Sequence, residues 1–186
     1  MDDKELARMR YWMDRLEIQD CINRYPRGLD RHDDDFLASV FWPDAVDNHG
    51  AWVGERDAFV EWANHACHDA FSGHAHNLTS HTCEIDGDTA HAETYVIFVL
   101  RQREGTNVEI GGGRYVDRLE KRDGEWRIAL RRLAMDWRID ADGGRWFKDK
   151  RPYPPGTWDR TDISYQRPLD LPENLREELD RKHAAE

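Results

Sequence analysis

The sequence predicts an α+β fold, and three observations support this prediction. Up to about residue 73 the apolar residues recur at helical steps of three and four, whereas from His74 onward they alternate with a period of two. Asp-Gly turns join the alternating runs, as they do in antiparallel hairpins. Helices followed by a meander of long strands indicate a cone-shaped α+β barrel, in which helices pack against a highly curved antiparallel sheet that encloses a cavity.

The opening segment predicts an amphipathic helix from about residue 3 towards residue 30. Its apolar residues start with Leu6 and Met9 and continue to Leu29 at helical spacing. The stretch RYPRGLDRHD closes this segment and contains Pro26 and Gly28. Pro26 lacks a backbone donor, so we expect it to kink or restart the helix, and Gly28 should loosen it further.

Two shorter helices are expected next. The aspartates at 33–35 can cap a helix in DDDFLASVF, which we expect Pro43 to stop. Residues 45–53 predict a short strand and turn. The stretch GERDAFVEWANHACHD then predicts a helix with Trp62 on its inward face.

Four long strands are predicted, over residues 74–85, 89–103, 108–121 and 125–139. Asp86-Gly87-Asp88 joins the first pair, and a second Asp-Gly turn around Asp123 joins the last pair. The run of three glycines at 111–113 lies inside a strand and predicts a bulge or a sharp bend.

Residues 1–140 are therefore expected to form the domain and residues 141–186 an irregular C-terminal tail. The tail is rich in proline and glycine, and residues 175–184 can form a short exposed helix. Aromatic residues in an irregular tail indicate that it packs on its own domain or on a neighbouring subunit. These residues are Trp146, Phe147, Tyr153, Trp158 and Tyr165.

Composition excludes several classes of function. The formal net charge of −11 over 186 residues argues against nucleic acid and anionic membranes as partners. No apolar stretch approaches the length of a membrane span, and the acidic N-terminus does not resemble a signal peptide. Three widely spaced cysteines, Cys21, Cys67 and Cys83, suit a reducing cytoplasm. The eight tryptophans suit a thick core or an aromatic-lined cavity.

The histidines are the main chemical signal, since no nucleotide-binding or nucleophile motif occurs. His74 and His76 share a strand face, as a metal pair would, but the spacing fits no common metal site, so we expect neither metal nor cofactor. A single imidazole oriented by a carboxylate makes a general base near neutral pH. His76 can serve as that base, with Asp30 from the end of the first helix as the carboxylate.

Arg131 and Arg132 lie in the otherwise apolar run WRIALRRLAMDW. Alternation sends them to opposite faces of the sheet, so one of them points inward. A buried arginine needs an anion, which is either a substrate or a carboxylate such as Asp30, Asp47 or Asp136.

Three stretches of the sequence resemble the SnoaL-like branch of the nuclear transport factor 2-like superfamily, over residues 8 to about 140. This branch includes scytalone dehydratase, hexachlorocyclohexane dehydrochlorinase, bile-acid dehydratase and diarylpropane formaldehyde lyases. Tyr25 and Asp30, five residues apart, are similar to an active-site pair of the bile-acid dehydratase. His76, nine residues before Ile85, has the register of the catalytic histidines of that enzyme and the dehydrochlorinase. Arg131, five residues after Trp126, resembles the active-site arginine of the dehydrochlorinase.

The resemblance implies a lyase that needs no cofactor. His76 would take a proton from carbon while Asp30 holds its ring. Tyr25 would donate a hydrogen bond to a leaving hydroxyl or a carbonyl oxygen, since its ordinary pKa disfavours a role as base. Arg131 would stabilise the developing anion.

The resemblance departs from known members at two positions. Tyr25 stands where the dehydrochlorinase has a lysine, and Val99 falls near the position of a second aspartate in the bile-acid dehydratase. These departures leave the leaving group open among water, halide and formaldehyde.

Cavity-facing positions of the family fall at Val96, Phe98 and Tyr115, and Trp62 is a candidate roof, each with core packing as the alternative. They imply a hydrophobic, aromatic or polycyclic substrate. A polyketide cyclase or ketosteroid-type isomerase would use the same dyad, and a non-catalytic subunit like the β chain of dioxygenases would use it only structurally. The resemblance also implies a homo-oligomer, with a trimer favoured over a dimer.

Overall fold

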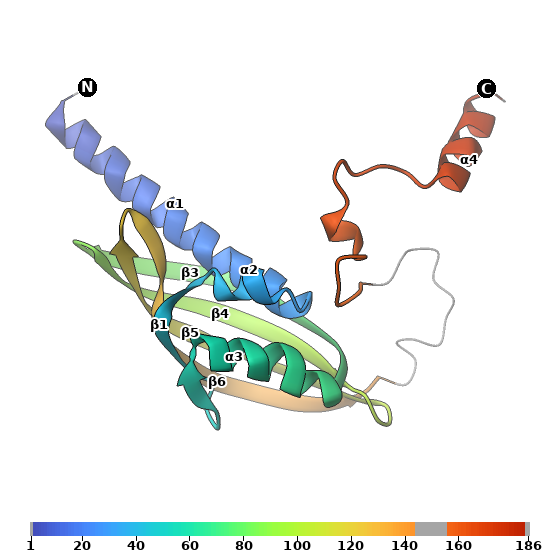
Figure 1. Ribbon diagram of the computed structural model, residues 1–186, viewed down its shortest axis with the longest axis horizontal. Helices are drawn as coiled ribbons and strands as arrows, with labels where there is room; N and C mark the ends of the chain where they lie inside the picture. Colours follow the sequence, from blue (N-terminus) through green and yellow to red (C-terminus); the bar gives the residue numbers. More distant parts are fainter. Residues whose placement is uncertain (1, 144–155, 185–186) are drawn as a thin grey trace. The chain divides into compact units, whose positions relative to one another are not determined.

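The computed structural model describes residues 2–143 and 156–184. The chain divides into two compact units, Met1–Lys150 and Arg151–Glu186, each of which is described by itself. In the first unit, helices precede a long-stranded sheet (Figure 1), which confirms the predicted α+β class. Its helical elements are α1 (Asp3–Asp30), α2 (Asp34–Ala38), α3 (Arg56–Glu61), the π-helix η1 (Trp62–Ala66) and the 3-10 helix η2 (Cys67–Asp69). Its strands are β1 (Phe41–Asn48), β2 (Val53–Glu55), β3 (Phe71–Asp86), β4 (Thr89–Gln102), β5 (Asn107–Arg122) and β6 (Glu125–Asp142).

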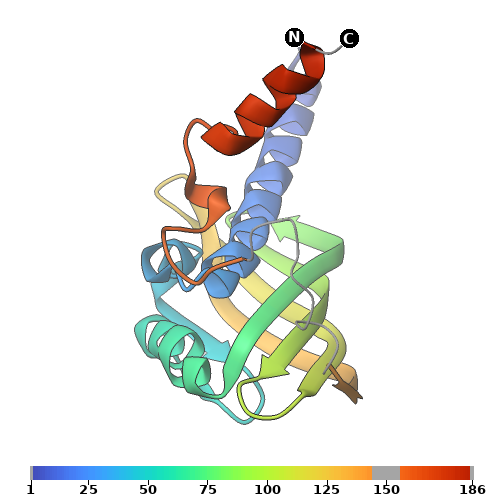
Figure 2. The same ribbon diagram turned by 90° about the vertical axis from the view of Figure 1, so that its right-hand side faces the viewer.

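The six strands form one sheet in the order β2-β1-β6-β5-β4-β3. The four long strands make the predicted antiparallel meander, and Figure 2 shows how strongly they curve. Two details differ from expectation. Strand β1 pairs parallel to β6, and the part of the sheet that the structure describes is open, with β2 and β3 at its edges, so it is not a closed barrel.

Helix α1 continues through Pro26 to Asp30, so the expected restart at Tyr25 does not occur. Tyr25 and Leu29 on either side of the proline are buried, and their packing stabilises the helix there. Gly28 also differs from expectation, because it allows close packing of two helices. A Cβ at this position would lie 2.7 Å from the Cα of Leu37 in α2.

The segment after α2 was predicted with the wrong boundaries. Helix α2 begins after the expected cap Asp33 but ends at Ala38, before Pro43. Pro43 lies inside β1, where the register with β6 shifts between Phe41 and Val46. Proline cannot donate to a strand ladder, so this irregular stretch is where a strand tolerates it.

The three glycines of β5 lie at a bulge, as predicted. Gly112 pairs with Trp137 and Gly113 with Met135, which leaves Asp136 as the extra residue on β6. A side chain added here would force an aromatic ring to move, because the Phe98 ring covers Gly111 and the Trp137 ring covers Gly112.

The core lies between the second half of α1 and the sheet. Ile18, Ile22 and Tyr25 of α1 are fully buried, as are Leu119 and Ile128 on the strands. The first half of α1 is largely uncovered by the rest of the first unit, and Leu16 is 68% exposed. No helix in residues 2–143 and 156–184 is both long and apolar enough to cross a bilayer.

The second unit contains the 3-10 helix η3 (Ile163–Tyr165) and helix α4 (Glu173–His183). The carboxylate of Asp162 caps η3 by accepting from the Ser164 amide, and Arg160 lies 4.8 Å from the centre of the Tyr165 ring. Helix α4 agrees with the helix expected over 175–184. Trp146, Phe147 and Tyr153 of the expected aromatic tail lie outside the described residues.

Candidate active site

Asp30 and His76 form the pair that the sequence predicts. His76 on β3 and Asp30 at the end of α1 are joined by a contact of 2.7 Å between Nδ1 and Oδ1. The second carboxylate oxygen, Oδ2, accepts the backbone N–H of His76 at 2.8 Å. The side chains are only 10% and 15% exposed. A carboxylate on Nδ1 leaves Nε2 as the unprotonated nitrogen of the neutral ring, and no described residue hydrogen-bonds to it.

More histidines gather beside this pair. The Nε2 atoms of His32 and His74 are 3.0 Å apart, and the rings of His74 and His76 are 5.7 Å apart. Burial lowers the pKa of His74 to about 3, and the neighbouring His76 contributes in the same direction. His74 is therefore neutral near pH 7 and can only donate or accept a hydrogen bond.

The same residues bear on the question of a metal. Ligand atoms of Asp30, His74 and His76 lie within 4.8 Å of one another. Both oxygens of Asp30 accept an N–H of His76, and the carboxylate on Nδ1 orients Nε2 of His76 either as a base or as a ligand.

Arg131 points inward, as alternation predicts, while Arg132 is exposed. The hydrogen-bonded partner of Arg131 is Asp117, which was not among the three carboxylates considered from the sequence. Asp47, which was among them, lies opposite Arg131 in the β1–β6 register and also favours its charged form. Two contacts of 2.8 Å join Nε and one terminal nitrogen of Arg131 to the Asp117 carboxylate. Both side chains are fully buried. Burial opposes the charged form of Arg131, but Asp117 outweighs it and raises the pKa of the guanidinium.

Tyr25 and Tyr115 enclose the Arg131 guanidinium, whose carbon lies 4.1 Å and 4.2 Å from their ring centres. Burial raises the pKa of both phenols above the usual value. The two hydroxyls influence each other, yet the Tyr25 hydroxyl makes no hydrogen bond of standard geometry with any described residue. Nη1 of Arg131 is likewise buried without a partner in that part of the chain. Nη1 of Arg131 is therefore a buried donor for an oxygen, and the Tyr25 hydroxyl is a second one when it is not engaged with the Tyr115 hydroxyl.

A second Asp–His pair, which sequence reasoning missed, lies next to this cluster. Nδ1 of His49 is 2.8 Å from Oδ1 of Asp47, whose side chain is 1% exposed. The His49 ring lies 6.0 Å from the Tyr115 ring and 5.6 Å from the Trp62 ring. The stretch DNHG gave a signal, since Asp47 near the end of β1 and His49 just after it are two residues apart, a spacing that places side chains on one side of an extended backbone.

The other predicted site residues separate into two groups. The Phe98 ring lies 6.2 Å from the His76 ring, and Tyr115 belongs to the arginine cluster. Val96 is buried in the core, and Trp62 stacks on Trp52 at 5.1 Å. Phe98 therefore lies next to His76, Tyr115 next to Arg131 and Trp62 next to His49, whereas Val96 lies among core residues.

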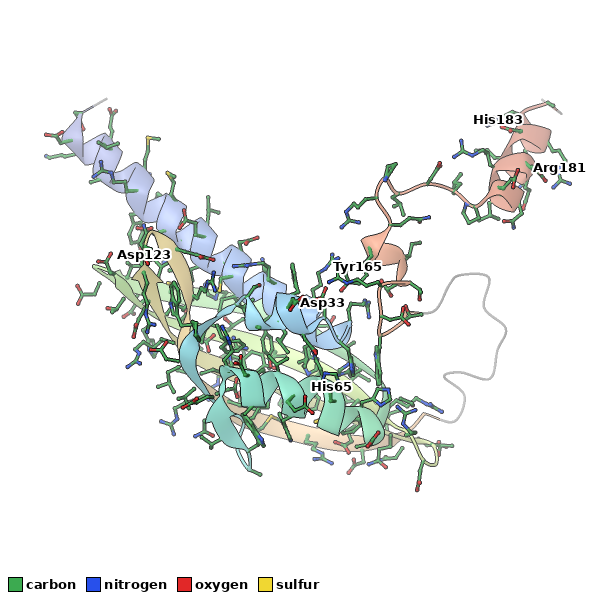
Figure 3. All side chains as sticks on the ribbon, viewed as in Figure 1. Asp33, His65, Asp123, Tyr165, Arg181 and His183 are labelled. Carbon is green, nitrogen blue, oxygen red and sulfur yellow. The ribbon has the colours of Figure 1, made fainter. Side chains whose placement is uncertain are left out.

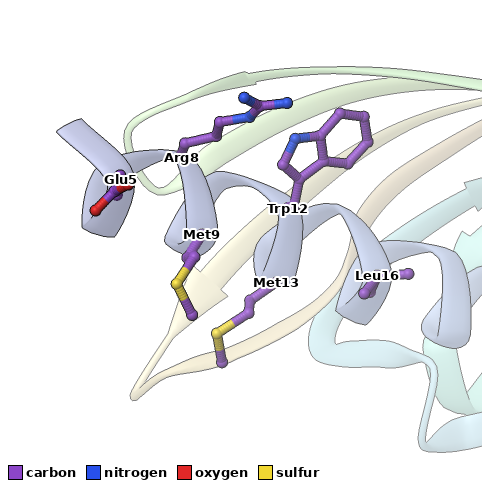
Figure 4. Close-up of a pocket in the computed structure, with 6 residues that line it drawn as sticks. All are labelled: Glu5, Arg8, Met9, Trp12, Met13 and Leu16. Carbon is purple, nitrogen blue, oxygen red and sulfur yellow. The ribbon is translucent and has the colours of Figure 1, made fainter. Parts of the chain in front are cut away.

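A separate pocket of about 690 Å³ lies on the uncovered half of α1 (Figure 4). It carries no acid–base pair, and its nearest lining residue precedes Asp30 by fourteen positions, about 21 Å along a helix. This pocket is therefore not part of the candidate active site. Its lining residues are Glu5, Arg8, Met9, Trp12, Met13 and Leu16.

Comparison with known proteins agrees with this architecture. A variant of Rv3472, a protein of unknown function from Mycobacterium tuberculosis, shares 33% identity and a TM-score of 0.60 over 68% of this chain and 74% of its own. A putative scytalone dehydratase from Novosphingobium aromaticivorans shares 23% identity and a TM-score of 0.62, covering 76% of this chain and 92% of its own.

The type 3 hexachlorocyclohexane dehydrochlorinase LinA from Novosphingobium barchaimii shares 21% identity and a TM-score of 0.67, covering 81% of this chain and 99% of its own. At these identities, the similarities to LinA and to the putative dehydratase both establish the fold alone. No curated protein matches the chain significantly. The model of the SnoaL-like domain matches residues 10–132. The chain therefore belongs to the SnoaL-like family of the nuclear transport factor 2-like superfamily.

Proposed function

We propose that the protein is a cofactor-independent lyase that eliminates a group from a hydrophobic, aromatic or polycyclic small molecule. The observation that carries this proposal is the double contact of Asp30 with His76, at 2.7 Å to Nδ1 and 2.8 Å to the backbone N–H. This contact fixes the ring and its tautomer, which a general base requires. Relatives named as a dehydratase and a dehydrochlorinase support the reaction class.

In the proposed reaction, Nε2 of His76 takes a proton from carbon. The C–H electron pair becomes part of a new C=C bond, and the neighbouring group leaves with its own bonding pair. Asp30 stabilises the imidazolium that forms. General acid–base catalysis contributes about 10²–10⁴-fold, so electrostatic stabilisation of the developing anion must supply part of the remainder.

Tyr25 and Arg131 are the proposed source of that stabilisation. The raised pKa of Tyr25 keeps it protonated at neutral pH, so it serves as a donor and not as a base. Asp117 already neutralises the charge of Arg131 and occupies two of its nitrogens. Arg131 can therefore stabilise the developing anion only through a hydrogen bond from the buried Nη1. Phe98, against the His76 ring, is the proposed contact for the apolar part of the substrate.

The test is a mass-spectrometric screen of hydrophobic aromatic alcohols and halides with the wild type, His76→Gln and His65→Gln. His65, labelled in Figure 3, is a matched control, because it also pairs with an aspartate at 2.8 Å but is 52% exposed. We expect product formation to be lost only in His76→Gln. A product of unchanged formula would favour the isomerase or cyclase alternative. If the wild type and both variants turn over no compound, and the two substitutions destabilise the fold equally, the alternative of a non-catalytic subunit is favoured.

A further inference from the structure

We propose that His49, oriented by Asp47, is a second acid–base group of the same site, which protonates an oxygen leaving group while His76 removes the carbon-bound proton. This inference rests on the proposed function and narrows it. The substrate class becomes compounds that lose water or another oxygen leaving group, in preference to halides.

The first step is the environment of Asp47. Its side chain is 1% exposed, and Oδ2 is buried without a hydrogen-bond partner among the described residues. A buried carboxylate with one unpaired oxygen is unfavourable for folding, and a packing role would be served better by apolar side chains. Arg131 lies opposite Asp47 in the β1–β6 register and offsets part of its charge. Oδ1 of Asp47 holds the His49 ring, which leaves Oδ2 for a polar group of a ligand.

The second step is the orientation of His49. Nδ1 is directed at Asp47, and the backbone N–H donates to the Trp52 carbonyl at 2.8 Å, so strand and ring are both fixed. Residues 2–143 and 156–184 offer no hydrogen bond to Nε2 of His49. The ring of Phe59, 5.5 Å away, and that of Trp62 limit its access to water. A general acid needs this combination of a fixed ring and an available N–H.

The third step is the position of His49 and of the Asp30–His76 pair beside one cluster, which consists of Tyr25, Tyr115 and Arg131. Tyr115 contacts the His49 ring on one side and the Tyr25 ring, at 5.2 Å, on another. The carboxylates of Asp47 and Asp30 both act on the Tyr115 phenol and oppose its ionisation. Asp30 follows Tyr25 by five residues on α1, about 7.5 Å along the helix axis, so both Asp–His pairs border the cluster of Tyr25 and Tyr115. In the proposal, one small molecule beside this cluster meets both imidazoles.

The chemistry explains why two imidazoles are needed. Hydroxide and alkoxide leave poorly, because water and alcohols are very weak acids, so the C–O bond breaks readily only as oxygen gains a proton. His76 gains the proton from carbon, the C–H pair forms the C=C bond, and the oxygen leaves with the C–O pair and the His49 proton. Each imidazole then exchanges its proton with solvent. Chloride needs no proton, so a dehydrohalogenase would have no use for His49.

The experiment uses two β-aryloxy ketones that share one benzylic skeleton and release either para-nitrophenoxide or para-methoxyphenoxide. His49→Gln should lower kcat/KM about 10²-fold or more for the methoxy compound, whose leaving group needs a proton, and less than about tenfold for the nitro compound. Asp47→Asn should change the ratio of the two rates in the same direction. Equal losses for both ketones, or no loss, would overturn the role of His49.

His76→Gln separates this inference from the proposed function, because it should lower both rates alike. If it leaves both unchanged, the lyase proposal fails. If it abolishes both while His49→Gln has no leaving-group dependence, only the present inference fails. A second measurement needs no turnover. Diethyl pyrocarbonate acylates only the neutral imidazole, so its reaction with His49 in the folded protein should accelerate as the pH rises, as mapped by peptide mass spectrometry. Protection of His49 at every pH at which His76 reacts would place Nε2 away from the site and refute the proposal.

Discussion

Replacing Asp30 by Asn is the sharpest test of the dyad, because the substitution keeps the size of the side chain and removes its charge. Asp30 accepts two N–H groups of His76, at 2.7 Å and 2.8 Å. An amide offers only one acceptor oxygen, so its NH₂ must face one of these donors. If it faces Nδ1, the ring is driven to the wrong tautomer, and if it faces the backbone N–H, that group loses its partner.

The magnitudes follow from these two outcomes. Loss of the oriented base should lower kcat/KM by about 10²–10⁴-fold, which corresponds to about 2.7–5.4 kcal/mol at ~1.36 kcal/mol per tenfold. An unpaired backbone N–H that is partly buried costs about 1–3 kcal/mol, so Tm should fall by roughly 2–12 °C. In either orientation the amide lacks the charge that stabilises the imidazolium, so activity should fall at temperatures where the variant is still folded.

The assay compares kcat/KM and thermal unfolding of Asp30→Asn, His76→Gln and their double variant on the substrate found in the screen. Residues that act as a unit are non-additive, so the double variant should be no slower than His76→Gln. Asp34→Asn is the control, because Asp34 forms a 2.8 Å contact with the exposed His65. If Asp30→Asn keeps activity within about threefold of the wild type while His76→Gln is inactive, the carboxylate does not orient the base.

Three further predictions concern packing, pH and assembly. Gly28→Ala should destabilise the fold by about 1–3 kcal/mol, measured by urea unfolding, because its methyl group meets the backbone of Leu37 at 2.7 Å. Burial alone would raise the pKa of Asp14, but its hydrogen bonds to Lys121 and Trp126 outweigh burial and lower it. The ionised Asp14 therefore stabilises the protein fully above about pH 4, and this contribution is lost as the pH falls further. The Tm difference between wild type and Asp14→Asn should accordingly be smaller at about pH 3 than at about pH 5. Trp137 is 45% exposed on the sheet, and Trp137→Arg should shift the proposed homo-oligomer to smaller species in light scattering, whereas an unchanged mass would exclude this face as the interface.

Periodicity and turn chemistry were sufficient for the long elements of the fold. Helix α1 and the four long strands follow from apolar spacing, and the turn at Asp123-Gly124 has the positive φ angles of 52° and 84° that its Asp-Gly pair suits. The prediction for the segment with Pro43 was wrong, because local sequence signals place a proline in a loop. Whether a strand can accommodate it depends on its pairing with β6, which lies far away in the sequence.

The candidate site was predicted unevenly for a related reason. Asp30 and His76 carry a recognisable spacing and register, so the sequence could bring together residues 46 positions apart. Which carboxylate neutralises Arg131 depends on the β5–β6 register, where Asp117 is its direct partner. That register depends on two bulges, and alternation alone gives no signal for either.

The glycine run in β5 has a consequence for how the two sides of the sheet communicate. Phe98 covers Gly111 and reaches the His76 ring, while Trp137 covers Gly112, the next residue of the strand. Successive residues of a strand face opposite sides of the sheet, so at this point the wall between the interior and the surface is a single bare backbone. No side chain of β5 therefore separates the Phe98 ring, beside His76, from the Trp137 ring on the exposed face of the sheet.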